Sequence, residues 1–545
     1  MDTLFQEYSE SVFSEENHVL GYTTLDGFLC EGQSLEEEND CSDASLKFIS
    51  EMLMEEMEDL GTEPGMPLDS LALQATEKSL YDALNNDLDK DPESPDDLFI
   101  RTLSLTTKRE KKNRNREDNI PTKEQRTNVG EPEPLEMYDN VLLDDGVTKT
   151  CGKPEQTKAK KKGGKKKEVV DLQSLLIKCA QAMANFDRIT VNDLLLQIRR
   201  HSSPQGDCSE RLAHYFANAL EARLAGTGSA LFAEFSLNKL SATDVLKAYK
   251  TYVSLFPLKK MLANKTIEKL ARGAATLHIV DFGILYGYQW PCLIQALSER
   301  RGGPPKLRIT GIDFPRPGFR PAERVTNTGL RLAEYCERFG VPFEYNAIIA
   351  QKWDTIRVED LKIHKNEYLV VTSLYRLQNM EDEETELVVN PRQVVLNLIR
   401  DINPNMFIHG VINGTYNTPF FIARFREALF HYASMFDMFE ATVPREDGNR
   451  LLIEQVYGSD VINIVACEGA ERTERPDSYR MWHVRSLKAG FRQLSFDPKI
   501  ISYVRSKVKR HYHKNFSVEE DGQWVLHSWK GRVNRAISCW QPAHN

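Results

Sequence analysis

The chain has few cysteines for its length, and no two of them have the spacing of a Cys-x-x-Cys motif. Nine cysteines are scattered over 545 residues without a Cys-x-x-Cys pair. This usage argues against a disulfide framework and a structural zinc site, and it favours reduced thiols inside a cell. Long apolar runs are missing too, since none approaches the roughly 18 residues of a membrane helix. The first residues also lack the regions of a secretory signal. We therefore expect a soluble intracellular protein without a membrane segment.

The motifs of common enzyme sites are absent as well. The sequence contains no Gly-x-x-x-x-Gly-Lys-Ser/Thr loop, no His-Glu-x-x-His helix and no Gly-x-Ser-x-Gly elbow. His511 and His513 lie in a basic run, where a surface position explains them better than metal ligation. The sequence assembles no catalytic constellation, and we expect no cofactor and no metal.

Positive charge is scarce in the first hundred residues. Residues 1–100 hold 27 Asp or Glu against 3 Lys or Arg, a net charge of −24, so the rest carries +14 of the chain's −10. An acidic arm before a basic body is typical of proteins that work near nucleic acid or basic partners. Residues 1–167 lack sustained hydrophobic periodicity, which predicts a mostly disordered tail.

Two segments of this tail, 46–60 and 71–84, place apolar residues on one helical face among acids. Such segments fold against hydrophobic grooves of partner proteins, as transcriptional activation segments do. The alternative is a solvated tail whose apolar residues have no partner. Two basic clusters follow, at 108–116 and, more densely, at 158–167. The second predicts nuclear import, against a merely solvated linker, through Lys158, Lys160, Lys161, Lys162, Lys165, Lys166 and Lys167.

From residue 168 the periodicity changes. Helical spacing of apolar residues over 168–272 predicts an all-helical cap. After residue 275, strands alternate with helices, which is typical of a parallel sheet. The predicted strands are 277–281, 307–313, 344–350, 367–372 and 406–412. We expect an α/β core with a C-terminal motif over 273–545, so that one folded domain spans 168–545 behind the tail.

One corner of this sheet resembles a cofactor site. A strand ending at Asp281, a turn from Gly283 to Gly287 and a helix near Trp290 form the nucleotide-binding corner of doubly wound sheets. Asp313 ends the next strand, where an acid would hold the ribose of a nucleotide or of S-adenosylmethionine. Bulky residues fill the turn, however, and would crowd the crevice. A methyltransferase that uses this crevice therefore remains the alternative to a protein without catalytic activity.

A second basic region lies near the C-terminus. Residues 499–514 collect six Lys or Arg among aromatic residues and histidines. Such density favours contacts with phosphates, with a steep salt dependence. The alternative is a helix with one solvated basic face. The candidate DNA contacts are Arg505, Lys507, Lys509 and Arg510.

Five blocks of residues follow one another in order along the chain. The first is Leu277-His278-Ile279-Val280-Asp281, between leucine-rich regions at 171–272 and 325–360. The remaining blocks are carried by Pro404, Phe420, Phe421, Arg426, Glu427, Trp482, Gly490, Trp524, Trp529, Ser538 and Trp540. These blocks resemble those of the GRAS family, the scarecrow-like transcriptional regulators of plants, whose first signature is Val-His-Ile-Ile-Asp. Cys539 stands where the family usually has alanine in Ser-Ala-Trp. We expect the tryptophans to be packing anchors, and Arg426 and Glu427 to have separate partners, because adjacent helix positions do not face each other.

The resemblance implies a helical cap on an α/β core similar to that of methyltransferases, in a family not established as enzymatic. The chain resembles the branch with long acidic N-termini, whose members are known as transcriptional activators or co-activators. Some of them are recruited by TGA-type bZIP factors. We therefore expect a nuclear regulator that acts through other transcription factors, as a homo- or heterodimer, with promoter DNA as a further candidate partner.

Overall fold

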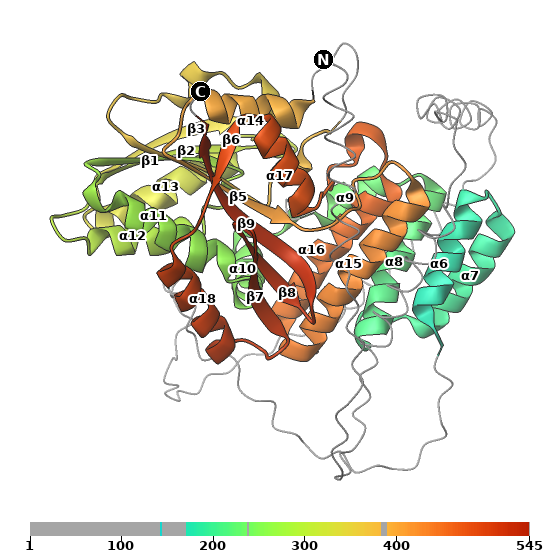
Figure 1. Cartoon of the computed structure of the whole chain (residues 1–545). Helices are drawn as coiled ribbons and strands as arrows, with labels where there is room; N and C mark the ends of the chain where they lie inside the picture. The colour runs from blue at the N-terminus through green and yellow to red at the C-terminus, as the bar shows by residue number, and fades with distance from the viewer. Residues whose placement is uncertain (1–141, 144–169, 237–238, 383–389, 544–545) are drawn as a thin grey trace, which may run out of the picture. The chain divides into compact units, whose positions relative to one another are not determined.

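The computed structural model describes residues 142–143, 170–236, 239–382 and 390–543 (Figure 1). The tail segments 46–60 and 71–84 and the lysine cluster at 158–167 lie outside these ranges. None of the helices in the described ranges is long and apolar enough to span a membrane.

A helical layer is built from two separate parts of the chain. The first part holds α6 (Leu172–Ala184), α7 (Arg188–His201), α8 (Cys208–Ala225) and α9 (Gly228–Phe235), followed by α10 (Ala242–Leu255). The second part is α15 (Phe421–Thr442) and α16 (Gly448–Ala466), which pack on α8. Figure 1 shows α15 and α16 beside α8 and α6. Acidic caps begin several of these helices; Asp207 and Glu210, for example, form a capping box on α8.

The core sheet is parallel over five strands. Its strands are β1 (Thr276–Phe282), β2 (Lys306–Asp313), β3 (Phe343–Ile349), β4 (Tyr368–Leu374) and β5 (Met406–Ile412). They lie in the order β3-β2-β1-β4-β5, so the strand order reverses between β1 and β4. In such sheets, ligand sites lie at the carboxyl ends of the strands on either side of this switch point.

Side chains alternate between two cores along these strands. In β1, Leu277 and Ile279 join the core beneath the helical layer, whereas Val280 and Phe282 join a second core on the other face. The first face is also covered by α11 (Asn264–Leu270), α12 (Trp290–Ser298) and α13 (Glu323–Arg338). The second face is covered by α14 (Pro391–Asp401) and α17 (Tyr479–Lys488).

Antiparallel strands extend the sheet beyond β5. The order continues β9-β8-β7, with β7 (Phe516–Asp521), β8 (Trp524–Trp529) and β9 (Arg532–Pro542), while β6 (Phe491–Leu494) pairs with the far end of β9. Helix α18 (Pro498–His511) lies between β6 and β7 in the chain and packs against β7. The predicted parallel core with helices around it is confirmed.

Candidate functional site

A cavity of about 500 Å³ lies at the switch point of the sheet. Asp281 at the end of β1, Tyr375 after β4 and Ile412 at the end of β5 line its base. Residues of α9, α10 and α16 line it from the helical layer. The helical layer and the carboxyl ends of the parallel strands thus enclose one space between them.

The turn after β1 is crowded, as the sequence predicted. Ile284, Tyr286 and Tyr288 are buried and line the cavity, and the two tyrosine rings stack with centroids 5.4 Å apart. Gly283 has φ +102°, and a Cβ there would come within 2.2 Å of Arg376 Cγ. In a nucleotide site a glycine admits the cofactor to the backbone; here the side chain of Arg376 takes that room.

The two acids that end β1 and β2 bond within the protein. Asp313 is fully buried and accepts the backbone N–H of Leu285 at 3.0 Å, and it pairs with Arg324 and Arg376 at 3.1 and 3.4 Å. Asp281 accepts hydrogen bonds from the Trp290 indole and the Thr372 hydroxyl, both at 3.0 Å. The position suited to a ribose is therefore occupied by arginines.

Several ionisable groups of the cavity have shifted pKa values. Burial raises the pKa of Asp281 to about 6, although Lys259 opposes the shift. Burial lowers the pKa of the Lys259 ammonium. Burial raises the pKa of both Asp460 and Glu474, and repulsion by Glu474 raises that of Asp460 further. Glu474 accepts hydrogen bonds from Asn379 and Gln378, at 2.6 and 3.3 Å. The cavity wall is charged yet poorly solvated.

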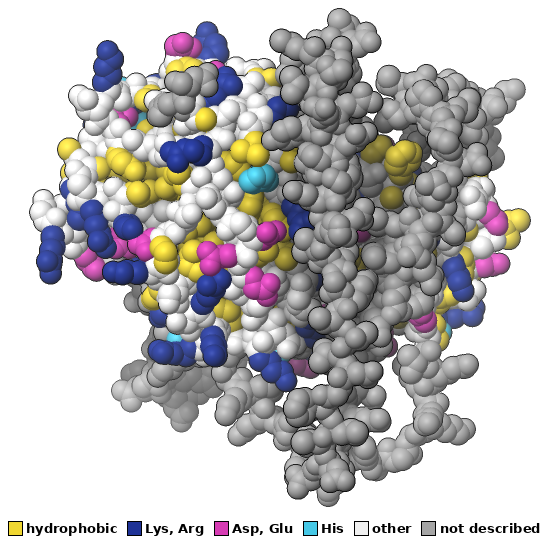
Figure 2. Space-filling model, viewed as in Figure 1, with side chains coloured by type: hydrophobic (Ala, Val, Ile, Leu, Met, Phe, Trp, Pro, Cys, Tyr) yellow, Lys and Arg dark blue, Asp and Glu magenta, His cyan; other side chains and the backbone are white. Residues whose placement is uncertain are grey.

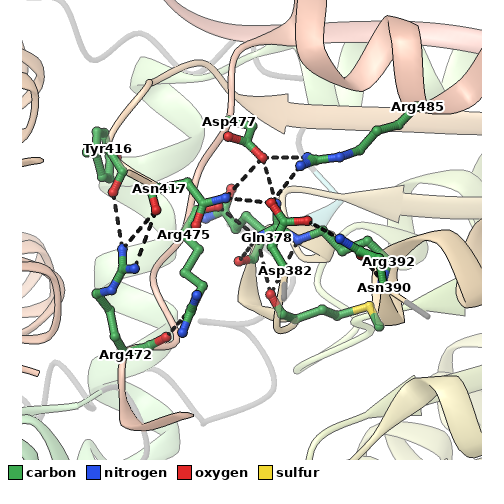
Figure 3. Close-up of polar contacts among 11 residues, drawn as sticks. Gln378, Asp382, Asn390, Arg392, Tyr416, Asn417, Arg472, Arg475, Asp477 and Arg485 are labelled. Atoms are coloured by element: carbon green, nitrogen blue, oxygen red, sulfur yellow. Dashed lines mark hydrogen bonds and ion pairs between the residues drawn. The ribbon is translucent and has the colours of Figure 1, made fainter. Parts of the chain in front are cut away.

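Four residues clamp the loops that close one side of the cavity. We call Asp382, Arg392, Asp477 and Arg485 the Arg–Asp clamp. Arg392 pairs with Asp477 at 2.7 Å and with Asp382 at 3.2 Å, and Arg485 bridges the same two acids. Figure 3 shows Arg392 and Arg485 converging on these carboxylates. The clamp ties the segment after β4 to the segment before α17.

The clamp is saturated with hydrogen bonds. Arg392 also donates to the carbonyl oxygens of Gln378, Met380 and Arg475, at 2.9 to 3.2 Å through Nη2. Burial lowers the pKa of Arg392 to about 10, so it stays charged at neutral pH. Burial would raise the pKa of Asp382, but Arg392 and Arg485 lower it overall. Gln378 and Met380 also line the cavity, so the clamp holds part of its wall.

His278, in the predicted signature, is a structural residue. Its Nδ1 lies 3.0 Å from Glu367 and its Nε2 lies 2.9 Å from the Thr310 hydroxyl. Nδ1–H therefore donates to the carboxylate, and Nε2 accepts from the hydroxyl. Burial, with Arg308 nearby, lowers the pKa of the imidazole to about 4. His278 links β1 to β2 and to the start of β4. Its neighbours Leu277, Ile279 and Val280 are buried core residues.

The signature tryptophans are buried, and three of them donate a hydrogen bond through the indole N–H. Trp529 donates to Asp437 at 2.7 Å, Trp540 to Ser538 at 2.6 Å, and Trp524 to the His483 ring at 3.3 Å. Trp482 lies beneath both clamp arginines, with the Arg392 and Arg485 guanidinium carbons 5.2 and 5.1 Å from its ring centroid. Gly490 has φ +83° just after α17. These residues bind core and clamp together, away from the cavity.

The signature residues around α15 also lie apart from the cavity lining. Phe420 caps α15 and is 61% exposed, whereas the Phe421 ring packs under Arg223 at 4.0 Å. Arg426 is buried on α15. Glu427 acts electrostatically on Arg532 of β9. Pro404 is buried just before β5.

The four candidate DNA contacts lie on α18. Arg505 donates to the Val518 carbonyl at 3.1 Å and pairs with Glu520 at 2.8 Å. Lys507 lies over the Tyr503 ring at 5.5 Å. Lys509 and Arg510 are exposed. Figure 2 shows Lys and Arg side chains where α18 lies, at the lower left of the view.

Sequence reasoning missed most of the charged cavity wall, namely Lys259, Tyr375, Asp460, Glu474 and Arg535. Two signals were present. Tyr375 and Arg376 directly follow β4, at a carboxyl end where ligand sites occur. Arg535 places a charged side chain within the largely buried strand β9. Within the described ranges, no group of three His, Cys, Asp or Glu residues is placed to hold a metal ion.

Comparison with known proteins identifies relatives of the whole domain. The GRAS domain family matches residues 172–541. Scarecrow-like protein 14 of Arabidopsis thaliana is 53% identical over 415 residues, which are 75% of this chain and 54% of that protein. Scarecrow-like protein 30 of the same plant is 41% identical over 580 residues, 99% of this chain and 97% of that protein. The match to the first thus spans about half of that protein's length.

A solved structure agrees with these matches. SCL7 of Oryza sativa superposes with a TM-score of 0.57 and 28% identity, over 68% of this chain and 100% of that one. The family match covers the helical layer, the sheet and the antiparallel extension together. The chain belongs to the GRAS family.

Proposed function

We propose that the protein is a nuclear regulator of transcription, an activator or co-activator, whose acidic tail recruits machinery while the folded domain binds partners. The observation that carries this proposal is the GRAS match over 172–541, behind an acidic arm with a net charge of −24 in residues 1–100. The arginine side chains that occupy the crevice support the proposal further. With Asp313 held by arginines and Gly283 covered by Arg376, the crevice offers S-adenosylmethionine little of what it needs.

A reporter assay tests the proposal. The intact protein and a variant that lacks residues 1–167 are each tethered to a heterologous DNA-binding domain. We expect deletion to abolish activation. Unchanged or repressive output would place the effector in the folded domain instead.

Nuclear entry is tested separately. Replacing the seven lysines of 158–167 with glutamine in a fluorescently tagged chain should leave the protein in the cytoplasm. The same change at Lys108, Lys111 and Lys112 of the first basic cluster is the comparison. Nuclear fluorescence that persists in the first variant would refute the import role.

Direct contact with promoter DNA is the finer part of the proposal, and it concerns α18. Lys509→Glu with Arg510→Glu should weaken promoter binding strongly and flatten its salt dependence, because phosphate contacts release counterions. The matched control is Arg320→Glu with Arg357→Glu, two exposed arginines elsewhere, whose side chains are 79% and 74% exposed. Equal binding by both variants would exclude α18 as the DNA surface.

Partner proteins have a candidate surface on α7. Ile189 and Leu196 are 78% and 60% exposed and lie two turns apart, with Phe186 at 70% just before the helix. We propose that this surface binds a second transcription factor, of which TGA-type bZIP proteins are the first candidates. Ile189→Asp with Leu196→Asp should disrupt co-precipitation with such a factor. The exposed polar residue Asn192, changed to Asp, is the control.

The methyltransferase alternative has its own test. A ligand that binds only the native state raises the melting temperature. Titration with S-adenosylmethionine to millimolar concentration should leave the melting temperature unchanged. A saturable rise would revive the enzymatic interpretation.

A further inference from the structure

The cavity contains two buried hydrogen-bond donors that lack an acceptor. They are the Arg535 Nε–H and the Tyr375 hydroxyl, on residues that are 2% and 8% exposed. Both residues line the cavity, and the Arg535 guanidinium carbon lies 5.7 Å from the centroid of the Tyr375 ring. Leaving such donors unpaired costs about 1–3 kcal/mol each. Two neighbouring donors without an acceptor indicate a place for an acceptor from outside the protein.

Arg535 has no directly bonded counterion, although the Asp460 and Glu474 carboxyls interact with it electrostatically. Its Nη1 donates to the Asn534 carbonyl at 2.9 Å and its Nη2 to the Tyr457 hydroxyl at 3.4 Å, and its guanidinium lies over the Phe256 ring at 4.5 Å. No carboxylate of the described residues lies within ion-pair distance of its guanidinium. A buried cation without a paired anion is costly. A ligand carboxylate would supply both the anion and the missing acceptor, in the planar geometry that guanidinium favours.

Tyr375 is held in a conformation that few residues adopt. Its φ is +69°, a left-handed value that is strained for an aromatic residue, and its N–H donates to the Gly410 carbonyl at 2.8 Å. Strain of this kind costs about 1–3 kcal/mol and clusters at functional sites. The conformation places Tyr375 at the carboxyl end of β4, in the cavity wall.

The rest of the cavity suits an apolar body. Tyr249 and Tyr252 of α10 stack with centroids 6.1 Å apart, and Phe232, Leu285 and Ile453 add apolar surface. A volume of about 500 Å³ is in the range of sites for small organic molecules. The Lys259 ammonium also lines the cavity; it makes no hydrogen bond or ion pair in the described structure, and the charges that act on it include Asp281. A second polar group on the ligand could accept a hydrogen bond from the Lys259 ammonium.

We propose that the cavity binds a small organic acid, with its carboxylate between Arg535 and Tyr375 and an apolar ring body against Tyr249 and Tyr252. Asp460 and Glu474 lie near Arg535, and burial raises the pKa of both carboxyls, which weakens their repulsion of a bound carboxylate. The ligand is not a nucleotide, because Asp313 and Gly283 are already covered by arginine side chains. The inference goes beyond transcription and does not depend on it.

Calorimetric titration of the full-length protein tests the site. The probes are benzoate, naphthoate and biphenyl carboxylate, together with the methyl ester of the last. We expect affinity to rise with the size of the apolar body and to fall about tenfold for the ester, a loss of about 1.4 kcal/mol. An ester that binds as well as its acid would overturn the proposed carboxylate site, as would the absence of heat and thermal shift with all three acids.

A variant pair separates the site from the fold. Tyr375→Phe removes only the hydroxyl that lacks an acceptor, and it should weaken biphenyl carboxylate about tenfold while the protein stays as stable as before. The matched control is Tyr345→Phe. The Tyr345 hydroxyl donates to the Val325 carbonyl at 3.0 Å, and this residue does not line the cavity. Equal affinity in the Tyr375 variant and the wild type would overturn the proposal. Because the readout is binding by purified protein, this result is independent of the reporter assay.

Discussion

The Arg–Asp clamp and the cavity wall are neighbours that treat buried charge in opposite ways. In the clamp, Arg392 is fully buried and bonded to two carboxylates and three backbone carbonyls. In the cavity wall, Arg535 is equally buried but forms no ion pair with a described carboxylate, and Lys259 makes no hydrogen bond there. The charges of the clamp are therefore paired within the protein, whereas Arg535 and Lys259 of the cavity wall form no ion pair with a described carboxylate.

The difference separates structure from binding. A paired buried charge stabilises a fixed arrangement of loops, and removing one partner is costly because the other is left behind. An unpaired buried charge reduces stability, so its presence in a folded domain points to a partner. The clamp holds loops that wall the cavity, so the stable cluster supports the incomplete one. Four predictions test this comparison.

The largest effect is expected in the clamp. Arg392→Met would leave Arg485 as the one described cation paired with Asp382 and Asp477, and it should lower the free energy of unfolding by about 3–5 kcal/mol. Urea unfolding measures this. Arg480→Met is the control, because the Arg480 side chain is 70% exposed and its ion pair with Asp521 is long, at 3.7 Å. This substitution should lower the free energy of unfolding by less than about 1 kcal/mol. Similar losses in both variants would remove the distinction between clamp and surface.

Acid should destabilise the domain through buried neutral histidines. The folded pKa of His278 is about 4 and its ordinary value is 6.5. Between these values the unfolded chain binds a proton that the folded chain does not, so stability falls as pH drops below about 6.5. The full contribution is about 3 kcal/mol.

His278→Gln should flatten this acid limb in urea unfolding at a series of pH values. The slope will not vanish, since burial also lowers the pKa of His214 to about 4 and those of His409 and His527 to about 3. His511→Gln, at an exposed position, should leave the slope intact. An unchanged slope in the His278 variant would mean that this imidazole is protonated in the fold.

Removing the unpaired ammonium of the cavity should change stability little. Lys259→Met keeps most of the length of the side chain, and Asp281 retains its bonds from Trp290 and Thr372. We expect the free energy of unfolding to stay within about 1 kcal/mol of wild type, or to rise. A loss as large as that of Arg392→Met would show that Lys259 is structural, and the comparison between clamp and cavity would fail.

The smallest effect on stability is expected on α18. Lys509→Glu with Arg510→Glu should alter the free energy of unfolding by no more than about 0.5 kcal/mol, because both side chains are exposed. Thermal unfolding of the DNA-binding variant checks this. A clear loss of stability would mean that weakened DNA binding by this variant reports on folding.

Local pattern predicted the regular elements that lie near each other in the sequence. Apolar runs ending in Asp281 and Asp313 marked β1 and β2, and helical spacing marked α13 and α15. The antiparallel extension was missed, because β8 is buried on both faces and shows no alternation. Its pairing with β9 also depends on β9 returning to β5, which no local signal encodes.

By itself the sequence determined the family, the parallel core and the crowding of the turn by Ile284, Tyr286 and Tyr288, since these follow from residue order and side-chain size. Only the tertiary structure decided which buried charges have a partner of opposite charge. Arg376 reaches Gly283 from the end of β4, and Arg535 meets Tyr375 across strands distant in the chain. Whether a buried charge has a partner depends on distances of a few ångströms between such strands, and residue order does not contain those distances.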